Sequence, residues 1–382
     1  MARGDGASAP PDNVLAPRGF ADRLLGWRDG LLSSARFQRW AAAFPLTRPI
    51  ANRRARALFD LCAGFVYSQI LVACVRLRVC DILLERPLTG EHLAARLALP
   101  VDPTLRLLEA AAALRLVEHR RDGRFGVGPL GAPLAGNPGI AAMVEHHALL
   151  YADLRDPVAM LRGDRGGTAL SRFWPYAAAP CVRESRPADV TGYSALMAAS
   201  QPLVAADVLA AHRFDRHRCL LDLGSGDGTF LTAVAEAAPA LRLILFDLPD
   251  VAAHARARFA GADRVQVVGG DFRHDPLPEG ADLVSLIRVI HDHDDAVALA
   301  ILRAAWRAMA PGATLLLAEP MAGTPNAEPV GAYFAVYLLA MGSGRPRRAE
   351  ELLRLVREAG FTGARVVPTR RPMLVRVVTA RR

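Results

Sequence analysis

The sequence predicts an α/β protein in which a doubly wound, mostly parallel sheet follows a helical winged-helix unit. From Cys219 onward, short apolar runs typical of buried strands alternate with helical patterns, as in doubly wound sheets. The first of these strands runs directly into a loop with three glycines at alternate positions. Ahead of that half, helical segments precede a strand–turn–strand pattern, which predicts the winged-helix unit.

The composition is that of a globular protein with a large core. Of the 382 residues, 52% are hydrophobic and 22% are charged, which excludes a disordered chain. No uninterrupted apolar run of about 18 residues occurs, so we expect no membrane-spanning helix. The first residues contain no apolar signal core, and the five cysteines show no CxxC spacing. We therefore expect a cytoplasmic chain with reduced thiols and no zinc ribbon.

A basic segment precedes the winged-helix unit. Residues 1–57 hold ten arginines against four acidic residues, and we expect a partly disordered extension that contains an amphipathic helix. Within 20–44, apolar residues recur at three- and four-residue steps with arginines between them: Phe20, Leu24, Trp27, Leu31, Phe37, Trp40 and Phe44. This spacing predicts either a helix that lies on the inner membrane or a helix that packs on a partner subunit.

The winged-helix unit is predicted from its helices and turn. A long apolar helix over 58–84 is followed by one capped by Thr89 and by one that begins at Asp102-Pro. Strands at 116–119 and 124–127 enclose an Asp-Gly turn. Winged helices bind DNA in regulators, but the third helix here has almost no polar side chains that can read base edges. We expect no nucleic acid; a ligand-sensing regulator is the alternative.

The second half is predicted to alternate strand and helix. Strands are expected at 220–223, 241–247, 265–268, 283–287 and 313–318, and helices at 229–238, 251–260, 294–309 and 349–359. A last pair of strands, 366–368 and 374–378, is expected to close the sheet as an antiparallel hairpin. Ligands in such sheets bind beyond the carboxyl ends of the strands, so the loops there form the candidate site.

The loop after the first strand has the strongest signal. Its three glycines are Gly224, Gly226 and Gly228. Glycine allows positive φ and lets a ligand approach the backbone. The dinucleotide fingerprint requires a further glycine where Thr229 stands. Asp222, ahead of the loop, would repel a pyrophosphate but suits an ammonium group, and Asp247, at the end of the second strand, can bind both ribose hydroxyls.

These acids and glycines together predict S-adenosylmethionine as the cofactor, because that molecule has an ammonium group and a ribose but no phosphate. After the third strand, Asp271 can bond an adenine amine and Phe272 can pack on its ring. For the glycine loop two alternatives stay open, a purely structural turn and an NAD site with an altered fingerprint. For Asp271 the alternative is a turn residue.

His291 is the candidate base. It follows the fourth strand, where an acceptor would meet the cofactor, and a histidine with a pKa near about 6.5 can take the proton of a hydroxyl. Glu319 ends the fifth strand on the same side and can orient the imidazole as in a catalytic triad. His293 is the alternative base. A metal bound by the cluster 291–295 is disfavoured, because adjacent residues on one turn rarely point at one ion.

Six segments match a known family: DLGSGDGTF at 222–230, FDLPDV at 246–251, GGDF at 269–272, IHDHDD at 290–295, LLLAEP at 315–320 and GSGRPRRAEELLRLVREAGF at 342–361. In this order they resemble the plant-type small-molecule O-methyltransferases, over roughly residues 58–380. The resemblance implies a homodimer, a winged-helix dimerisation domain, a Rossmann-like class I methyltransferase domain and S-adenosyl-L-methionine as methyl donor. Within the family, the segments 319–325 and 337–347 are most similar to the bacterial hydroxyneurosporene (demethylspheroidene) O-methyltransferases of carotenoid biosynthesis.

The resemblance also implies a role for each matching residue. It makes His291 the base and Glu319 its flanking acid, and it places Met197 and Asp292 at the acceptor. To the cofactor it assigns Asp222, Gly224, Gly226, Asp247, Asp271, Phe272 and Arg288. Two departures stand out. Plant enzymes usually have a tryptophan where His293 stands, and they carry a second acid near the late glycines, where 344–348 has none.

The predicted function is methylation of the C-1 tertiary hydroxyl of an acyclic hydroxycarotenoid, an apolar small molecule. Such an alcohol is far less acidic than a phenol, so the base would take the proton as the methyl group arrives, in a dry pocket. A phenolic metabolite and a bacteriochlorophyll precursor are the alternative acceptors. The predicted domains are the extension 1–57, the dimerisation domain with linker helices 58–190, and the cofactor-binding catalytic domain 191–382.

Overall fold

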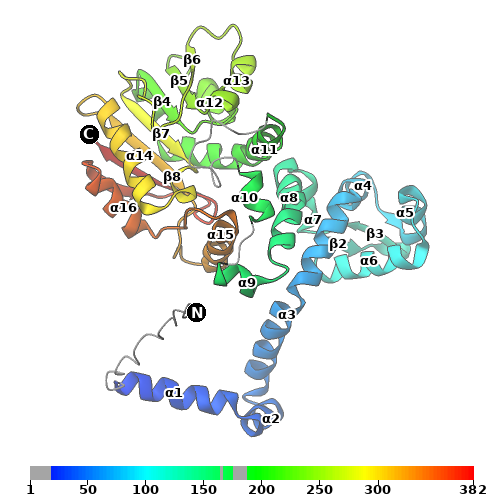
Figure 1. Cartoon of the computed structure of the whole chain (residues 1–382). Helices are drawn as coiled ribbons and strands as arrows, with labels where there is room; N and C mark the ends of the chain where they lie inside the picture. The colour runs from blue at the N-terminus through cyan, green and yellow to red at the C-terminus, as the bar shows by residue number, and fades with distance from the viewer. Residues whose placement is uncertain (1–18, 164–166, 175–186) are drawn as a thin grey trace, which may run out of the picture. The chain divides into compact units, whose positions relative to one another are not determined.

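The computed structural model describes residues 19–163, 167–174 and 187–382 (Figure 1). The predicted disorder ahead of residue 19 lies outside the described residues. The chain divides into two compact units, 1–70 and 71–382, which are described separately. This division differs from the predicted domain limits, which stay a prediction. The four described cysteines, Cys62, Cys74, Cys80 and Cys219, are free thiols.

The first unit consists of helices α1 (Phe20–Ser33), α2 (Ala35–Ala43) and most of α3 (Arg48–Arg76). The pattern over 20–44 therefore forms two helices rather than one, because Ser34 is extended and its hydroxyl accepts from the Phe37 N–H at 3.5 Å. The rings of Phe37, Trp40 and Phe44 lie along one side of α2, with Trp40 and Phe44 stacked at 5.2 Å.

Helix α3 is long and apolar enough to cross a membrane by length and composition, although it contains no uninterrupted apolar run of about 18 residues. An 18-residue window within its 29 residues has a mean hydropathy of 1.8. The expectation required an uninterrupted apolar run, but Gly64, Ser68 and Gln69 interrupt the run without bringing the mean down far. The finding concerns length and composition only, which core helices of globular proteins share.

The winged-helix unit has the predicted arrangement. Helices α4 (Val79–Glu85), α5 (Gly90–Leu97) and α6 (Val101–Ala113) accompany a small antiparallel sheet of order β1-β3-β2, formed by Leu88–Thr89, Arg124–Val127 and Val117–His119. The Thr89 hydroxyl caps α5 by accepting from the His92 N–H at 3.4 Å, as predicted. The expected long helix to residue 84 instead ends at Arg76, because Arg78 has a φ of 52° and separates α3 from α4.

Between this unit and the large sheet, the described residues form five α-helices: α7 (Gly131–Ala135), α8 (Pro138–Asp153), α9 (Pro157–Arg162), α10 (Ala169–Phe173) and α11 (Pro187–Ala211). Helix α15 (Glu328–Met341), which the sequence pattern did not predict, packs with α8 and α10 around a buried cluster that includes Leu150, Leu170 and Leu338. This packing brings aromatic side chains of α15 next to histidines of α8.

The large sheet has seven strands in the order β6-β5-β4-β7-β8-β10-β9 (Figure 1). Its strands are β4 (Cys219–Leu223), β5 (Arg242–Asp247), β6 (Val265–Gly269), β7 (Leu283–Ile287), β8 (Thr314–Glu319), β9 (Thr362–Val367) and β10 (Arg376–Arg381). The first five are parallel, and β10 is antiparallel to β8 and β9, so the predicted doubly wound sheet with a closing hairpin is confirmed. The order reverses between β4 and β7, which is where ligands of such sheets bind.

Helices cover both faces of this sheet, because alternate residues of each strand point to opposite sides. Leu220 belongs to the buried cluster with α11 and α12 (Thr229–Ala237), whereas Leu221 belongs to the cluster with α14 (Asp295–Ala308) and α16 (Ala349–Glu358). Helix α13 (Pro249–Arg258) follows β5. These elements hold the loops at the carboxyl ends of the strands in place.

Candidate active site

The loop after β4 depends on glycine for both conformation and packing. Gly224 and Gly228 have φ values of 71° and 84°. A Cβ atom at Gly224 would lie 2.7 Å from Val289 Cγ2, and one at Gly228 would lie 2.3 Å from the Phe259 ring. Gly226 also has positive φ but faces open space. The loop is thus packed at both ends, and its middle faces open space.

Two carboxylates hold this loop. Asp222 accepts from the Ser285 and Ser225 hydroxyls at 2.5 and 2.6 Å, and Asp247 accepts from the N–H groups of Gly226 and Leu248 at 2.7 Å each. Burial raises the pKa of Asp222 to about 7 and that of Asp247 to about 6, and the charge of Asp247 adds to the rise at Asp222. The groups that bind these two carboxylates are hydroxyls and amides, which carry no net charge. The negative charge of the acids is therefore available to attract a cationic ligand.

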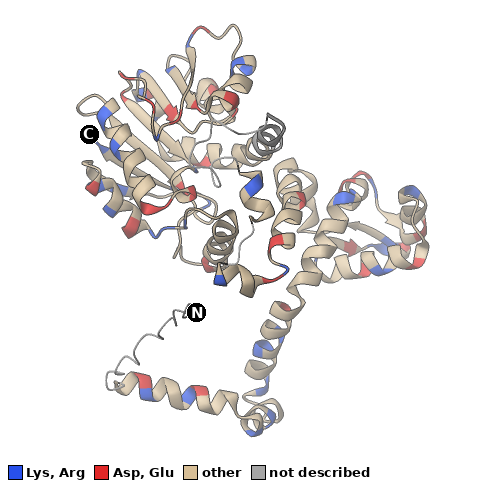
Figure 2. Ribbon diagram, in the orientation of Figure 1, with Lys and Arg blue, Asp and Glu red and all other residues tan. Residues whose placement is uncertain are grey.

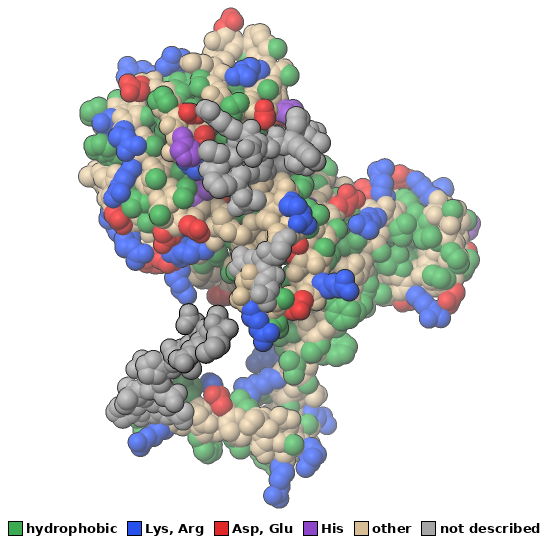
Figure 3. Space-filling model, in the orientation of Figure 1, with side chains coloured by type: hydrophobic (Ala, Val, Ile, Leu, Met, Phe, Trp, Pro, Cys, Tyr) green, Lys and Arg blue, Asp and Glu red, His purple; other side chains and the backbone are tan. Residues whose placement is uncertain are grey.

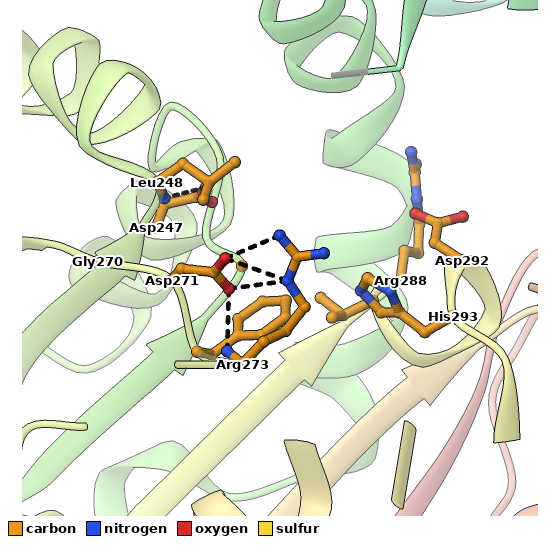
Figure 4. A pocket seen from close by; sticks show the side chains of 11 residues that line it. Asp247, Leu248, Gly270, Asp271, Arg273, Arg288, Asp292 and His293 are labelled. Carbon is orange, nitrogen blue, oxygen red and sulfur yellow. Dashed lines mark hydrogen bonds and ion pairs between the residues drawn. The ribbon is translucent and has the colours of Figure 1, made fainter. Parts of the chain in front are cut away.

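A cavity opens at the carboxyl ends of the strands beside this loop (Figure 4). Of the predicted site residues, its lining includes Gly224, Asp247, Asp271, Phe272, Arg288 and Asp292. Asp247, Asp271 and Arg273 lie on one side of the view, and Arg288, Asp292 and His293 lie on the other. Asp222 and Gly226 are not among the lining residues.

The carboxylate of Asp271 is already paired with Arg273, a partner that the sequence analysis did not predict. Arg273 donates from Nε to Oδ1 at 3.0 Å and from Nη2 to Oδ2 at 2.8 Å. Burial opposes ionisation of Asp271, but these bonds outweigh it and lower the pKa of the carboxyl to about 2. An adenine amine at Asp271 would therefore share the carboxylate with Arg273.

His293 belongs to the cavity wall. Its ring stands perpendicular to Phe272 with the centroids 5.7 Å apart, and both residues line the cavity. Burial lowers the pKa of His293, which keeps the imidazole neutral at pH 7. A neutral ring beside Phe272 suits contact with an aromatic ligand.

His291 makes a different set of contacts, with Glu319 as its main partner. Its Nδ1 lies 2.5 Å from Glu319 Oε2. The other carboxylate oxygen accepts from the N–H groups of Val289 and Ile290 at 3.1 and 2.7 Å. Glu319 is only 3% exposed. One buried carboxylate therefore fixes both the imidazole and the backbone turn that carries it.

Asp292 and Phe334 complete the surroundings of this imidazole. His291 Nε2 lies 3.2 Å from Asp292 Oδ1, and the Phe334 ring of α15 stands nearly perpendicular to it at 5.9 Å. Burial favours the neutral ring, but the charges of Asp292 and Glu319 outweigh it and raise the pKa of His291 above 6.5. His291 and Glu319 do not line the cavity; Asp292 connects them to it.

Arg288 links the end of β7 to α11. It has a φ of 59°, and its N–H donates to the Ala318 carbonyl at 2.8 Å. Its guanidinium donates to the Ser200 hydroxyl at 2.9 Å and lies 2.8 Å from the Met197 sulfur. Left-handed backbone at a non-glycine residue costs on the order of 1–3 kcal/mol and clusters at functional sites. Met197 thus contacts a residue of the cavity wall without lining the cavity itself.

Comparison with known proteins identifies the family of this chain. A family model for the O-methyltransferase domain matches residues 151–362, and a model for the O-methyltransferase dimerisation domain matches residues 59–134. The chain belongs to the O-methyltransferase family. This confirms the resemblance seen in the motifs.

The relatives of this methyltransferase include two bacterial demethylspheroidene O-methyltransferases. The one from Cereibacter sphaeroides is 43% identical over 92% of this chain and 93% of its own length. The one from Rhodobacter capsulatus is 42% identical over 88% of this chain and 85% of its own. Mitomycin 7-O-methyltransferase MmcR shares the structure with a TM-score of 0.71 and 26% identity, over 87% of this chain and 99% of that one. Human N-acetylserotonin methyltransferase shares the fold at a TM-score of 0.72 and 22% identity, over 86% and 97%.

The methyltransferase is S-adenosylmethionine-dependent, and its loop residues fit that molecule. Asp222 and Asp247 supply negative charge for a cationic ligand, and Asp247 stands at the end of β5, where it can bind ribose hydroxyls. Phe272 and His293 form an aromatic part of the cavity wall, on which an adenine ring could pack. The role of each individual residue stays a prediction.

Sequence reasoning missed several contributors to the site. Ser285 bonds Asp222 because the two residues are opposite one another in the parallel β4–β7 pair, and only the sheet order reveals that register. Arg273 follows Asp271 by two residues, and this spacing was the one local signal available. Among the described residues, no three histidine, cysteine or acidic side chains group as a metal site.

We expect the affinity for S-adenosylmethionine to fall as the pH is lowered from about 8 to about 5.5. The pKa values of Asp222 and Asp247 are raised to about 7 and about 6, so both acids gain protons in this range and lose the charge that holds a cation. Asp247→Asn should weaken binding about tenfold or more at pH 8, since a hydrogen bond to a charged group contributes about 1.5–3 kcal/mol.

Isothermal titration calorimetry across this range measures both effects. Asp250→Asn, an exposed acid in the first turn of α13, is the matched control and should bind like wild type. An affinity that stays constant with pH, or that Asp247→Asn leaves unchanged, would contradict the assignment.

Proposed function

We propose that the methyltransferase methylates the C-1 tertiary hydroxyl of an acyclic hydroxycarotenoid, with His291 as general base. The base assignment is supported by the 2.5 Å bond between His291 Nδ1 and Glu319, next to the cavity wall. The acceptor class is supported by the two demethylspheroidene O-methyltransferases, which match the chain over most of its length.

Glu319 determines which nitrogen of His291 is available. Its carboxylate accepts from Nδ1–H, so Nε2 is left to take a proton. When bound, S-adenosylmethionine would supply a methyl group on a positively charged sulfur, which would keep the electron pair of the S–C bond that breaks and leave as a neutral thioether. As the acceptor oxygen forms its new bond to carbon, its proton passes to Nε2. Glu319 and Asp292 then stabilise the imidazolium, since their charges already raise the pKa of this histidine.

Asp292 occupies the position that the acceptor needs. Its Oδ1 lies 3.2 Å from Nε2, so the acceptor hydroxyl must take the place of this carboxylate at the nitrogen. A tertiary alcohol does not ionise beforehand, so proton transfer has to accompany methyl transfer. The burial of His291 and Glu319 keeps water away from the proton that moves.

We also propose that a second copy of the chain covers the apolar surface of α3. The dimerisation-domain match begins at residue 59, within this helix. Phe65 is 73% exposed and Leu61 80%, and Leu58, Phe59 and Val66 are also exposed. Figure 3 shows hydrophobic side chains gathered over α3. Exposed apolar surface of this kind favours association with a protein surface.

We propose that residues 20–44 contact the cytoplasmic face of the membrane, where an apolar acceptor would be dissolved. Phe20, Trp27 and Trp40 are all more than half exposed. Residues 20–57 contain eight arginines and two aspartates. Figure 2 shows some of this positive charge on the first half of α3. Aromatic side chains with arginines beside them suit a surface of anionic lipid.

We expect purified enzyme with radiolabelled S-adenosylmethionine to label 1-hydroxycarotenoids in detergent micelles. A catechol and a bacteriochlorophyllide are offered in parallel. His291→Ala should lower kcat by about 10²-fold or more, the usual contribution of a general base, while cofactor affinity stays the same. His293→Ala is the control that distinguishes the two histidines and should keep the pH profile of wild type.

In wild type, kcat should rise with pH through a midpoint above 6.5, because the pKa of His291 is raised and the base must be neutral. Label in the catechol or the bacteriochlorophyllide alone would overturn the carotenoid acceptor. Wild-type turnover by His291→Ala would overturn the base.

We expect Phe65→Glu combined with Leu61→Glu to convert the dimer to a monomer, because two charges on the apolar face of α3 are not compatible with a buried interface. Light scattering during size-exclusion chromatography measures the mass. Leu161→Glu on α9, also exposed at 70%, is the matched control and should remain dimeric. A double variant with the mass of two chains would place the interface elsewhere.

We expect the chain to sediment with vesicles of phosphatidylglycerol and phosphatidylcholine, less so as salt screens the arginines. Trp27→Ser with Trp40→Ser should reduce the bound fraction several-fold, whereas Leu161→Ser should not. If the tryptophan variant binds vesicles like wild type, the membrane contact is wrong. If it loses the dimer instead, residues 20–44 pack on the partner subunit.

A further inference from the structure

The turn that carries His291 consists of residues 290–293. All four of its backbone carbonyls accept hydrogen bonds from one segment that is distant in the sequence. We call this segment, Ser343–Arg347, the brace. It follows α15, and it donates to four consecutive carbonyls of the turn. Its donations are Arg347 Nη1 to the Ile290 carbonyl at 2.7 Å, the Arg345 N–H to His291 at 2.9 Å, the Ser343 hydroxyl to Asp292 at 2.9 Å and Arg347 Nη2 to His293 at 2.7 Å.

Arg347 spans the turn from its first carbonyl to its last. Its side chain is 3% exposed, and Nε donates to Asp295 Oδ1 at 2.9 Å, which neutralises the buried charge. The planar guanidinium offers donors in fixed directions, whereas a lysine ammonium is a single point of charge that cannot reach the same three acceptors. The contact is therefore specific to arginine.

Gly344 allows the brace to lie against the turn. It has a φ of 77°, and a Cβ atom there would lie 2.2 Å from the His291 carbonyl oxygen. Its N–H donates to Asp294 Oδ1 at 3.1 Å. Any larger residue at 344 would push the brace away from the carbonyl next to the base.

The brace also contacts the chain that follows Glu319. The Ala322 N–H donates to the Arg347 carbonyl at 2.9 Å, and Ala322 forms a bridge with Arg348. One segment thus fixes the turn of His291 and the loop after its acid partner. Glu319 holds the N–H side of the same turn, so the imidazole is held from both sides.

We propose that Arg347 is a positioning residue for the base: by holding the carbonyls on either side of His291 and Asp292, it keeps Nδ1 on Glu319 and Nε2 turned toward the acceptor. The inference rests on the proposed role of His291. The brace itself contains no acidic residue. Here the segment acts through the backbone of the turn rather than through the imidazole.

The test compares Arg347→Lys with Ser343→Ala, which removes one of the four donors, and with Arg348→Lys, an exposed neighbour, as the matched control. We expect Arg347→Lys to lower kcat about tenfold to a hundredfold with little change in cofactor affinity, and Ser343→Ala to lower it about threefold. Arg348→Lys should behave like wild type.

A second readout needs no acceptor. Histidine labelled with ¹³C at Cε1 is followed by NMR against pH, and the His291 signal is identified by its absence in His291→Asn. The groups that face this imidazole are Glu319, Asp292, Arg288 and Phe334. In Arg347→Lys the midpoint of the His291 titration should move down toward 6.5, because the imidazole is no longer held between the carboxylates of Glu319 and Asp292.

The two readouts separate the possible failures. If wild type methylates none of the acceptors offered, the proposed function fails, but the NMR titration still tests the brace. An unchanged His291 midpoint and a kcat within twofold of wild type in Arg347→Lys would overturn the inference. If Arg347→Lys does not fold, Ser343→Ala decides: an unchanged midpoint and kcat there overturn it, and a lowered midpoint supports it.

Discussion

The buried carboxylate of Glu319 controls the arrangement around His291, the proposed base. One oxygen accepts from two backbone N–H groups of the turn after β7, and the other accepts from the imidazole of His291. A carboxylate buried in this way is stable only while those donors stay in place. The parallel pairing of β7 and β8 brings Glu319 to the same sheet edge as the turn. Base, acid and sheet therefore form one unit.

The acids of the site differ in what holds them, and this difference separates their roles. Asp222 and Asp247 are held by hydroxyl and amide groups, and burial raises their pKa values to about 7 and about 6. Asp271 is held by Arg273, and its pKa falls to about 2. The first two can respond to a cationic ligand, whereas Asp271 is already paired. Negative charge that a cationic ligand could use therefore lies at the glycine loop.

Much of this was predictable from sequence, within limits that particular residues illustrate. The strands, their helices and the glycine loop were predicted to within a few residues because burial imposes a local period on the sequence. Helix α15 escaped prediction because it is apolar along most of its length, which leaves no amphipathic period to detect. The ends of α3 and α4 were missed because the break depends on one left-handed residue, Arg78.

By itself the sequence determined the fold class, the chemistry of the glycine loop and the candidate base, since each of these depends on residues that lie close together in the sequence. Only the tertiary structure decided which partners those residues have. It joins His291 to Glu319 across 28 residues, Asp222 to Ser285 across 63, and Arg347 to the Ile290 carbonyl across 57. His293 lines the cavity and His291 does not, although only one residue separates them in the sequence. Contacts between distant segments depend on strand order and packing, which local periodicity does not specify.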